Sequence, residues 1–126
     1  MKRRILIVED ELGFRRLLEY LLSQYYAVTA LANGEEAVSW LEQGNEVDLV
    51  ITDIEMPRMT GLEMVAHMRQ LEEFENLPVI LISSRDMAVM RPAIENLNVA
   101  DCLRKPVQPK VLYWKVEEIL QRTPLY

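Results

Sequence analysis

Short apolar runs rich in β-branched residues alternate along this chain with longer segments of helical periodicity, and this alternation restricts the fold more than any other feature. Three runs are wholly apolar: residues 5–8 (Ile-Leu-Ile-Val), 49–51 (Leu-Val-Ile) and 79–82 (Val-Ile-Leu-Ile). Short runs without polar alternation are typical of strands buried on both faces of a parallel sheet. Two more polar runs, residues 27–30 and 101–104, are weaker candidates for strands and suit the edges of a sheet.

Helical patterns fill the segments between these runs. An apolar stripe at positions i, i+3, i+4, i+7 and i+8 predicts an amphipathic helix; its members are Phe14, Leu17, Leu18, Leu21 and Leu22. A second helix is expected to open with Asn33 as N-cap and to end near Gly44. A third begins with a capping box between Thr60 and Glu63, and a last helix follows Pro109.

The fourth helical segment, between Arg85 and Asn98, contains a proline. Proline lacks a backbone N–H and is best tolerated in the first turn of a helix. Because Pro92 lies well inside the segment, we expect a helix that is short, late-starting or kinked.

The element order is therefore β-α repeated five times. Crossovers between parallel strands are nearly always right-handed, so the helices should cover both faces of a five-stranded, doubly wound sheet. The length of 126 residues, without repeats or linker-like stretches, predicts one α/β domain over residues 1–126.

Charge and cysteine content exclude several classes of function. The net charge of −6 disfavours direct nucleic-acid binding, which needs clustered lysine and arginine. A single cysteine can form neither an intramolecular disulfide nor a cysteine-rich zinc site. No apolar stretch reaches the length of a membrane span, and acids at positions 9–11 interrupt the first apolar run too early for a signal peptide. We expect a soluble cytoplasmic domain with no membrane association.

Polar residues follow four of the predicted strands. Glu9 and Asp10 end the first strand, Asp53 the third, Ser83 the fourth and Lys105 the fifth. In open α/β sheets, ligands bind beyond the carboxyl ends of the strands, so these side chains should gather at one edge. Neighbouring carboxylates repel one another, and a divalent cation relieves that repulsion. Mg²⁺ fits best, because it takes one or two carboxylates and keeps several waters.

Other interpretations of these acids are available. Calcium also binds oxygen but wants more ligands than this loop obviously supplies, and the lack of histidine and cysteine in the cluster disfavours zinc or copper. Alternatively, the acids at positions 9–11 only stabilise a helix N-terminus, by about 0.3–1 kcal/mol each. The joint arrangement over four strand ends favours the metal site.

At this point the sequence resembles a known family, the receiver domain of bacterial two-component response regulators. Four segments carry the resemblance, in the family's order: residues 5–11 (Ile-Leu-Ile-Val-Glu-Asp-Glu), 53–61 (Asp-Ile-Glu-Met-Pro-Arg-Met-Thr-Gly), 77–84 (Leu-Pro-Val-Ile-Leu-Ile-Ser-Ser) and 105–106 (Lys-Pro). The resemblance covers essentially residues 4–122, and the segment 53–61 is its most specific part. It implies a flavodoxin-like (βα)5 fold with strand order 2-1-3-4-5.

The resemblance also implies roles for individual residues. Asp53 would be the phosphoacceptor, taking a phosphoryl group from the phosphohistidine of a sensor histidine kinase or a histidine phosphotransfer protein. Lys105 and Ser83 would assist, the lysine by its charge and the serine by a hydrogen bond to the phosphoryl oxygens. The implied Mg²⁺ ligands are Glu9, Asp10, Asp53 and the backbone carbonyl of Glu55. On this interpretation the chain is a signalling domain and no enzyme in its own right.

One position departs from the family. Receivers usually carry a tyrosine or phenylalanine on strand five that changes rotamer when Ser83 moves, and the alignment set by Lys105 puts Cys102 there. A cysteine cannot sweep out the volume of an aromatic ring, so Cys102 is an atypical switch residue and is expected to act as a small apolar filler. The family's face of helix four, strand five and helix five would serve a homodimer or an output partner.

Two other classes of function compete with the phosphoacceptor. A degenerate receiver would act as an interaction module that ignores phosphorylation, as Cys102 and Pro92 suggest. A flavodoxin-like electron carrier would need a loop of glycine, serine and threonine amides after the first strand, where this chain has three acids. A dehalogenase-type phosphatase would need its nucleophilic aspartate after the first strand and usually a longer chain.

Overall fold

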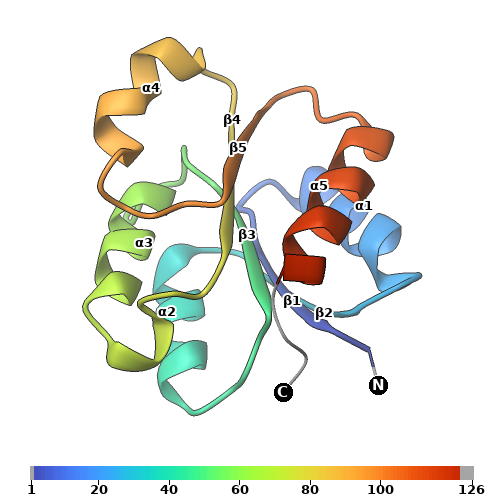
Figure 1. The fold of residues 1–126 in the computed structure, drawn as a ribbon, viewed down its shortest axis with the longest axis horizontal. Coiled ribbons are helices and arrows are strands. Elements are labelled where there is room, and N and C mark those ends of the chain that lie inside the picture. The colour runs from blue at the N-terminus through green and yellow to red at the C-terminus, as the bar shows by residue number, and fades with distance from the viewer. Residues whose placement is uncertain (1, 123–126) are drawn as a thin grey trace.

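A computed structural model describes residues 2–122, and within them five parallel strands form one sheet in the order β2-β1-β3-β4-β5. The strands are β1 (Arg4–Val8), β2 (Ala27–Leu31), β3 (Leu49–Asp53), β4 (Val79–Ser83) and β5 (Asp101–Arg104). Both weaker strand candidates are present, at the two edges of the sheet. The predicted flavodoxin-like α/β fold and its strand order are confirmed (Figure 1).

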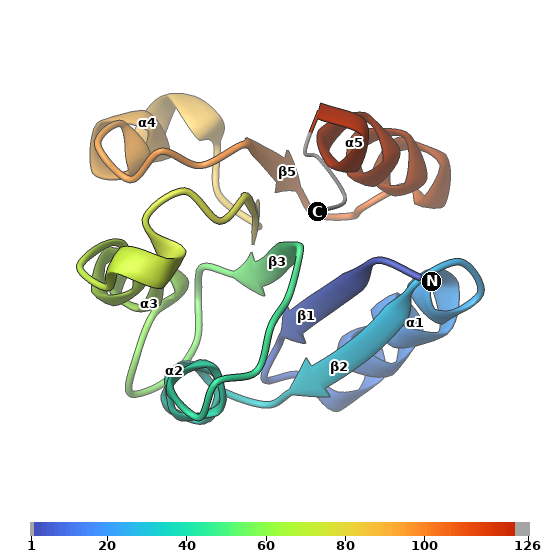
Figure 2. The ribbon, with the colours of Figure 1, turned by 60° about the horizontal axis from the view of Figure 1, so that its bottom comes forward.

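The helices form a layer on each side of this sheet. Their bounds are α1 (Leu12–Ser23), α2 (Gly34–Glu42), α3 (Gly61–Arg69), α4 (Met87–Ile94) and α5 (Pro109–Arg122), with a short 3₁₀ turn, η1 (Glu72–Phe74), before β4. Figure 2 shows α1 and α5 together on one face and α2, α3 and α4 on the other. The sheet thus separates two cores, as expected for a doubly wound protein.

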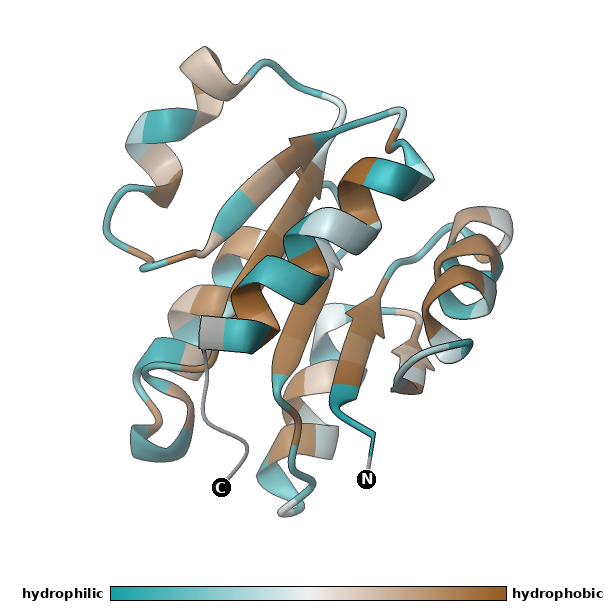
Figure 3. Cartoon of the chain, turned by 45° about the vertical axis from the view of Figure 1, so that its right-hand side comes forward, coloured by the Kyte–Doolittle hydropathy of each residue, from teal (hydrophilic) through white to brown (hydrophobic). Residues whose placement is uncertain are grey.

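Alternation along the strands feeds both cores. In β1, Ile5 and Ile7 pack with the α1–α5 layer, whereas Leu6 and Val8 pack with the α2–α3–α4 layer. Successive strand side chains point to opposite faces, so a strand buried on both faces must be apolar throughout. The continuous hydrophobic colouring of the central strands in Figure 3 is this pattern.

The predicted helix ends agree with the structure. The Asn33 side chain accepts a hydrogen bond from the N–H of Glu36, and Thr60 and Glu63 form the complete capping box. Helix α5 begins at Pro109. The apolar stripe of α1 is less uniform than expected, because Leu18 and Leu22 are buried while Leu17 is 47% exposed.

Helix α4 tests the expectation drawn from Pro92. The helix is short, with eight residues, but it begins at Met87, so a late start is wrong. Pro92 lies within it and removes the N–H that would bond to the carbonyl of Ala88. Both residues are exposed, so water can solvate the freed carbonyl, and the helix ends at Ile94.

None of the described helices combines the length and the apolar character that crossing a membrane requires.

Candidate functional site

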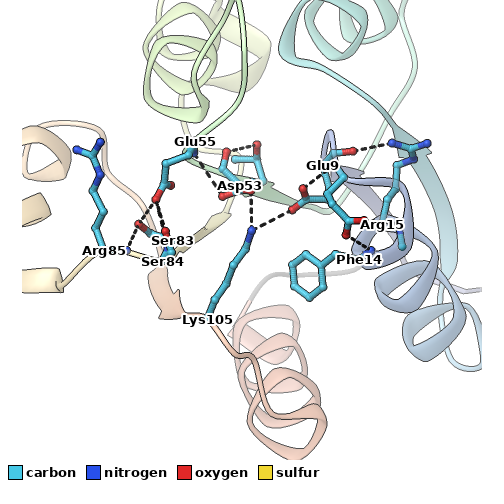
Figure 4. A network of polar contacts seen from close by, with 12 residues as sticks. Glu9, Phe14, Arg15, Asp53, Glu55, Ser83, Ser84, Arg85 and Lys105 are labelled. Atoms are coloured by element: carbon cyan, nitrogen blue, oxygen red, sulfur yellow. Dashed lines mark hydrogen bonds and ion pairs between the residues drawn. The ribbon is translucent and has the colours of Figure 1, made fainter.

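The carboxyl edge of the sheet brings together the residues predicted from the strand ends. Glu9 follows β1, Asp53 is the last residue of β3, Ser83 is the last of β4, and Lys105 follows β5. These four strands are consecutive neighbours in the sheet, so side chains distant in sequence converge (Figure 4). Glu9, Asp53 and Ser83 are 1%, 3% and 1% exposed, whereas Asp10 lies open to solvent.

Three carboxylates form the acidic cluster of this edge. One oxygen from each of Glu9, Asp10 and Asp53 lies within 4.8 Å of the others. Among residues 2–122, Glu9 Oε1 is buried without a hydrogen-bond partner, and its nearest cation, Lys105 Nζ, is 3.7 Å away. A buried carboxylate oxygen without a donor is costly, so the cluster suits a hard cation that prefers oxygen ligands.

Lys105 supplies the positive charge that faces this cluster. Its Nζ donates a hydrogen bond to Asp53 Oδ2 at 2.8 Å and lies 5.0 Å from the centre of the Phe14 ring. Burial alone would lower the pKa of Lys105, but the hydrogen bond and charge of Asp53, together with the charge of Glu9, outweigh it and raise the pKa. The ammonium is therefore held in its charged form beside Asp53. The Lys105–Pro106 peptide bond is cis.

The Glu9 carboxyl group has a raised pKa. Burial raises its pKa to about 7, and the charge of Asp53 adds to the effect, while the N–H of Glu11 and the charge of Lys105 oppose it. Two residues further on, the exposed Glu11 side chain accepts hydrogen bonds from the N–H groups of Phe14 and Gly13, which lower its pKa. Glu11 is thus the N-cap of α1, while Glu9 faces the site.

The Glu55 side chain makes a contact that sequence reasoning missed. Its Oε1 accepts hydrogen bonds from Ser83 Oγ at 3.0 Å, Ser84 Oγ at 3.0 Å and the Ser84 N–H at 3.3 Å. Burial would raise the pKa of Glu55, but the bonds from Ser84 and Ser83 outweigh it and lower the pKa. No signal in the sequence identifies this contact, since a glutamate in a loop is as easily solvated.

The loop after Asp53 ends in Gly61, at a position where the backbone leaves no room for a side chain. A Cβ built on Gly61 would lie 2.2 Å from the backbone oxygen of Asp53, and the Gly61 N–H donates to Ile54 O at 2.9 Å. Only a residue without a side chain lets the start of α3 lie this close to the end of β3. The glycine therefore fixes the backbone that carries Asp53.

Cys102 lies on β5, partly buried against the core between the sheet and the α2–α3–α4 layer. Burial raises the pKa of its thiol to about 11, and the charges of Asp101 and Glu55 add to the effect. The side chain is thus a neutral thiol under ordinary conditions, in agreement with a small apolar filler.

Three carboxylates and one lysine thus lie at the carboxyl edge of a doubly wound, flavodoxin-like α/β sheet, the edge at which such folds bind ligands. Comparison with known proteins makes this more specific: the family model of the response regulator receiver domain matches residues 5–117. This chain belongs to that family, the receiver domains of two-component signalling systems.

Individual relatives agree. "Regulator of RpoS" from Escherichia coli (strain K12) is 44% identical over 108 residues, which cover 84% of this chain and 31% of that protein. "Hybrid signal transduction histidine kinase D" of Dictyostelium discoideum is 33% identical over 116 residues, covering 92% of this chain and 7% of that protein. The chain thus spans less than a third of either relative.

A solved structure, the signal receiver domain of a signal transduction histidine kinase from Syntrophus aciditrophicus, has a TM-score of 0.89 at 27% identity. The comparison covers 98% of this chain and 94% of that one.

Proposed function

We propose that residues 1–126 act as one phosphoacceptor domain and that Asp53 is the residue that becomes phosphorylated. The observation that carries this proposal is the setting of Asp53: its carboxylate is buried, accepts a hydrogen bond from Lys105 at 2.8 Å, and belongs to a cluster of three carboxylates. A sensor histidine kinase or a histidine phosphotransfer protein is the proposed donor.

In the proposed reaction an Asp53 oxygen attacks the phosphorus of a phosphohistidine. The new O–P bond forms as the P–N bond breaks, and the leaving imidazole nitrogen keeps the electron pair of that bond. Phosphoryl transfer needs mainly positioning and neutralisation of charge on the phosphoryl oxygens. Lys105 supplies one positive charge, and Ser83, at the end of the neighbouring strand, supplies a hydroxyl donor.

Glu9, Asp10, Asp53 and the backbone carbonyl of Glu55 are the proposed ligands of Mg²⁺. With all three carboxylates ionised, their charge against one ammonium is −2, which a divalent cation would balance. When bound, Mg²⁺ would neutralise charge on the phosphoryl oxygens. The buried Glu9 Oε1, which lacks a donor among the described residues, supports this assignment.

Phosphorylation adds about −1.5 to −2 charges at the end of β3 and would draw Ser83 toward Asp53, shifting an inactive–active equilibrium. The proposed readout is the face of α4, β5 and α5, where a homodimer or an output partner would bind, with Cys102 in the position of the usual aromatic switch. The proposal includes a cytoplasmic location, where the kinase would act.

The direct test is phosphoryl uptake. Incubation with acetyl phosphate and Mg²⁺ should add one phosphoryl group, detected by intact mass, and Asp53→Asn should abolish the addition. Failure of the wild-type protein to take up phosphate from acetyl phosphate or from any phosphohistidine donor would refute the proposal.

A second candidate, an interaction module that ignores phosphorylation, is favoured by one observation: Cys102 stands in place of the aromatic switch. Binding of one partner with equal affinity before and after phosphorylation would support it.

A further inference from the structure

The Glu55 carboxylate accepts hydrogen bonds from Ser83, the last residue of β4, and from Ser84, the residue after it, and it is not part of the acidic cluster. Figure 4 shows its side chain directed at Ser83 and Ser84, across from the side where Lys105 meets Asp53. All three donors converge on Oε1, while Oε2 is buried without a hydrogen-bond partner among the described residues.

The hydrogen bond to Glu55 occupies the Ser83 hydroxyl as a donor. A serine hydroxyl has one proton to donate, and in this structure Ser83 Oγ donates it to Glu55 Oε1 at 3.0 Å. The same oxygen accepts a hydrogen bond from the N–H of Arg85 at 2.9 Å, so the Ser83 hydroxyl donates to Glu55 and accepts from Arg85. Ser83 can donate to a phosphoryl oxygen on Asp53 only after it leaves Glu55.

We propose that Glu55 is a positioning residue that holds Ser83 and Ser84 in the unphosphorylated arrangement and competes with the phosphoryl group for their hydroxyls. This inference rests on the proposed function of Asp53. An aspartyl phosphate brings three acceptor oxygens and about −1.5 to −2 charges two residues away from Glu55. It offers the serines a stronger acceptor and repels the Glu55 carboxylate, so phosphorylation breaks the Glu55 contacts.

The first experiment uses the metal-free protein and needs no phosphorylation. Glu55→Ala removes the acceptor of the Ser84 N–H and the partner that orients Ser83 Oγ toward the Arg85 N–H, so both amides should exchange with deuterium about tenfold faster. Glu55→Gln keeps an acceptor oxygen and should restore most of the protection. The Ile51 amide in central β3 reports global opening and should exchange equally in all variants.

The second experiment measures the affinity for beryllofluoride, a phosphoryl mimic, by calorimetry in saturating Mg²⁺. The substitution Glu55→Ala releases the two serines, so beryllofluoride should bind about tenfold more tightly. This gain is about the free energy of one hydrogen bond to a charged group. Glu55→Gln should lie between wild type and Glu55→Ala. The matched control is Glu73→Ala. Glu73 is exposed and lies before β4, at the amino ends of the strands, so this variant should bind beryllofluoride as the wild type does. Titrations with Mg²⁺ alone separate any change in metal affinity.

A double-mutant cycle decides whether Glu55 acts through the serines. In a Ser83→Ala, Ser84→Ala background, Glu55→Ala should change beryllofluoride affinity by less than twofold. A tenfold change that persists there would mean that Glu55 acts by charge alone and would overturn the inference, as would wild-type amide exchange and affinity in Glu55→Ala. If the wild-type protein takes up phosphate but Glu55→Ala behaves identically, only this inference fails. If the wild type takes up none, the proposed function fails first.

Discussion

The raised pKa of Glu9 makes a quantitative prediction about metal binding. A Mg²⁺ ion that binds Glu9 must displace the proton that this carboxyl holds below a pKa of about 7. If binding requires the ionised form, the apparent dissociation constant scales as 1 + 10^(pKa − pH). The factor is about eleven at pH 6 and close to one at pH 8, so Mg²⁺ should bind about tenfold more weakly at pH 6. About one proton should be released per ion at pH 6, and about a tenth of one at pH 8.

Calorimetric titration of Mg²⁺ at pH 6, 7 and 8, in pairs of buffers with different protonation enthalpies, gives both the affinity and the number of protons released. Glu9→Gln removes the titrating group, so its affinity should be lower but nearly independent of pH over this range. Glu11→Gln is the matched control, because Glu11 is exposed and its lowered pKa keeps it ionised above pH 6. Affinity that stays within twofold between pH 6 and pH 8, or a tenfold change that survives in Glu9→Gln, would refute the reasoning.

Four further outcomes are expected. Without metal, Glu9 binds a proton more tightly in the folded than in the unfolded chain. Its contribution to the free energy of unfolding should therefore fall, by up to about 3 kcal/mol, as pH rises from about 4.5 to about 7. Urea unfolding of the wild type and of Glu9→Gln over this pH range measures the contribution, and a difference that does not change with pH would contradict the prediction. Gly61→Ala forces a Cβ against the Asp53 carbonyl and should destabilise the fold by about 1–3 kcal/mol in the same assay, an unchanged midpoint being the contrary result. Lys105→Met removes the cation beside Asp53 and should slow phosphoryl uptake from acetyl phosphate by about tenfold or more; a wild-type rate would deny Lys105 its role. Cys102, whose pKa is about 11, should react with iodoacetamide at pH 8 far more slowly than free cysteine, and equal rates would exclude a buried neutral thiol.

Much of the fold follows from local patterns in the sequence. The strands can be predicted from the sequence because helices cover both faces of the sheet. The runs at residues 5–8 and 79–82 must therefore be apolar throughout. The caps of α2 and α3 are readable because a side chain bonds the backbone three residues away. Helix α4 was harder to foresee, since the tolerance of Pro92 depends on the exposure of the carbonyl at Ala88, which is a property of the tertiary structure.

The candidate site, like the fold, could be predicted from the sequence only in part. Strand topology alone brings Glu9, Asp53 and Lys105 together, because parallel strands end at one edge. The direction of the Glu55 side chain depends on a choice between water and two serine hydroxyls, which no spacing encodes. The raised pKa of Glu9 could not be predicted from the sequence either, because it depends on burial. Glu9 is buried, whereas its immediate neighbour Asp10 is exposed.

The separation of the core into two layers has a consequence for how such a domain can diverge. Residues of the α1–α5 layer, such as Leu112, and those of the α2–α3–α4 layer, such as Val65, belong to different clusters on opposite sides of the sheet. Substitutions in different clusters, without shared partners, usually have additive effects on stability. One layer can therefore accumulate changes suited to a new binding partner while the other keeps its packing. The strand ends that carry the acids and the lysine lie between the two layers, at the carboxyl edge of the sheet.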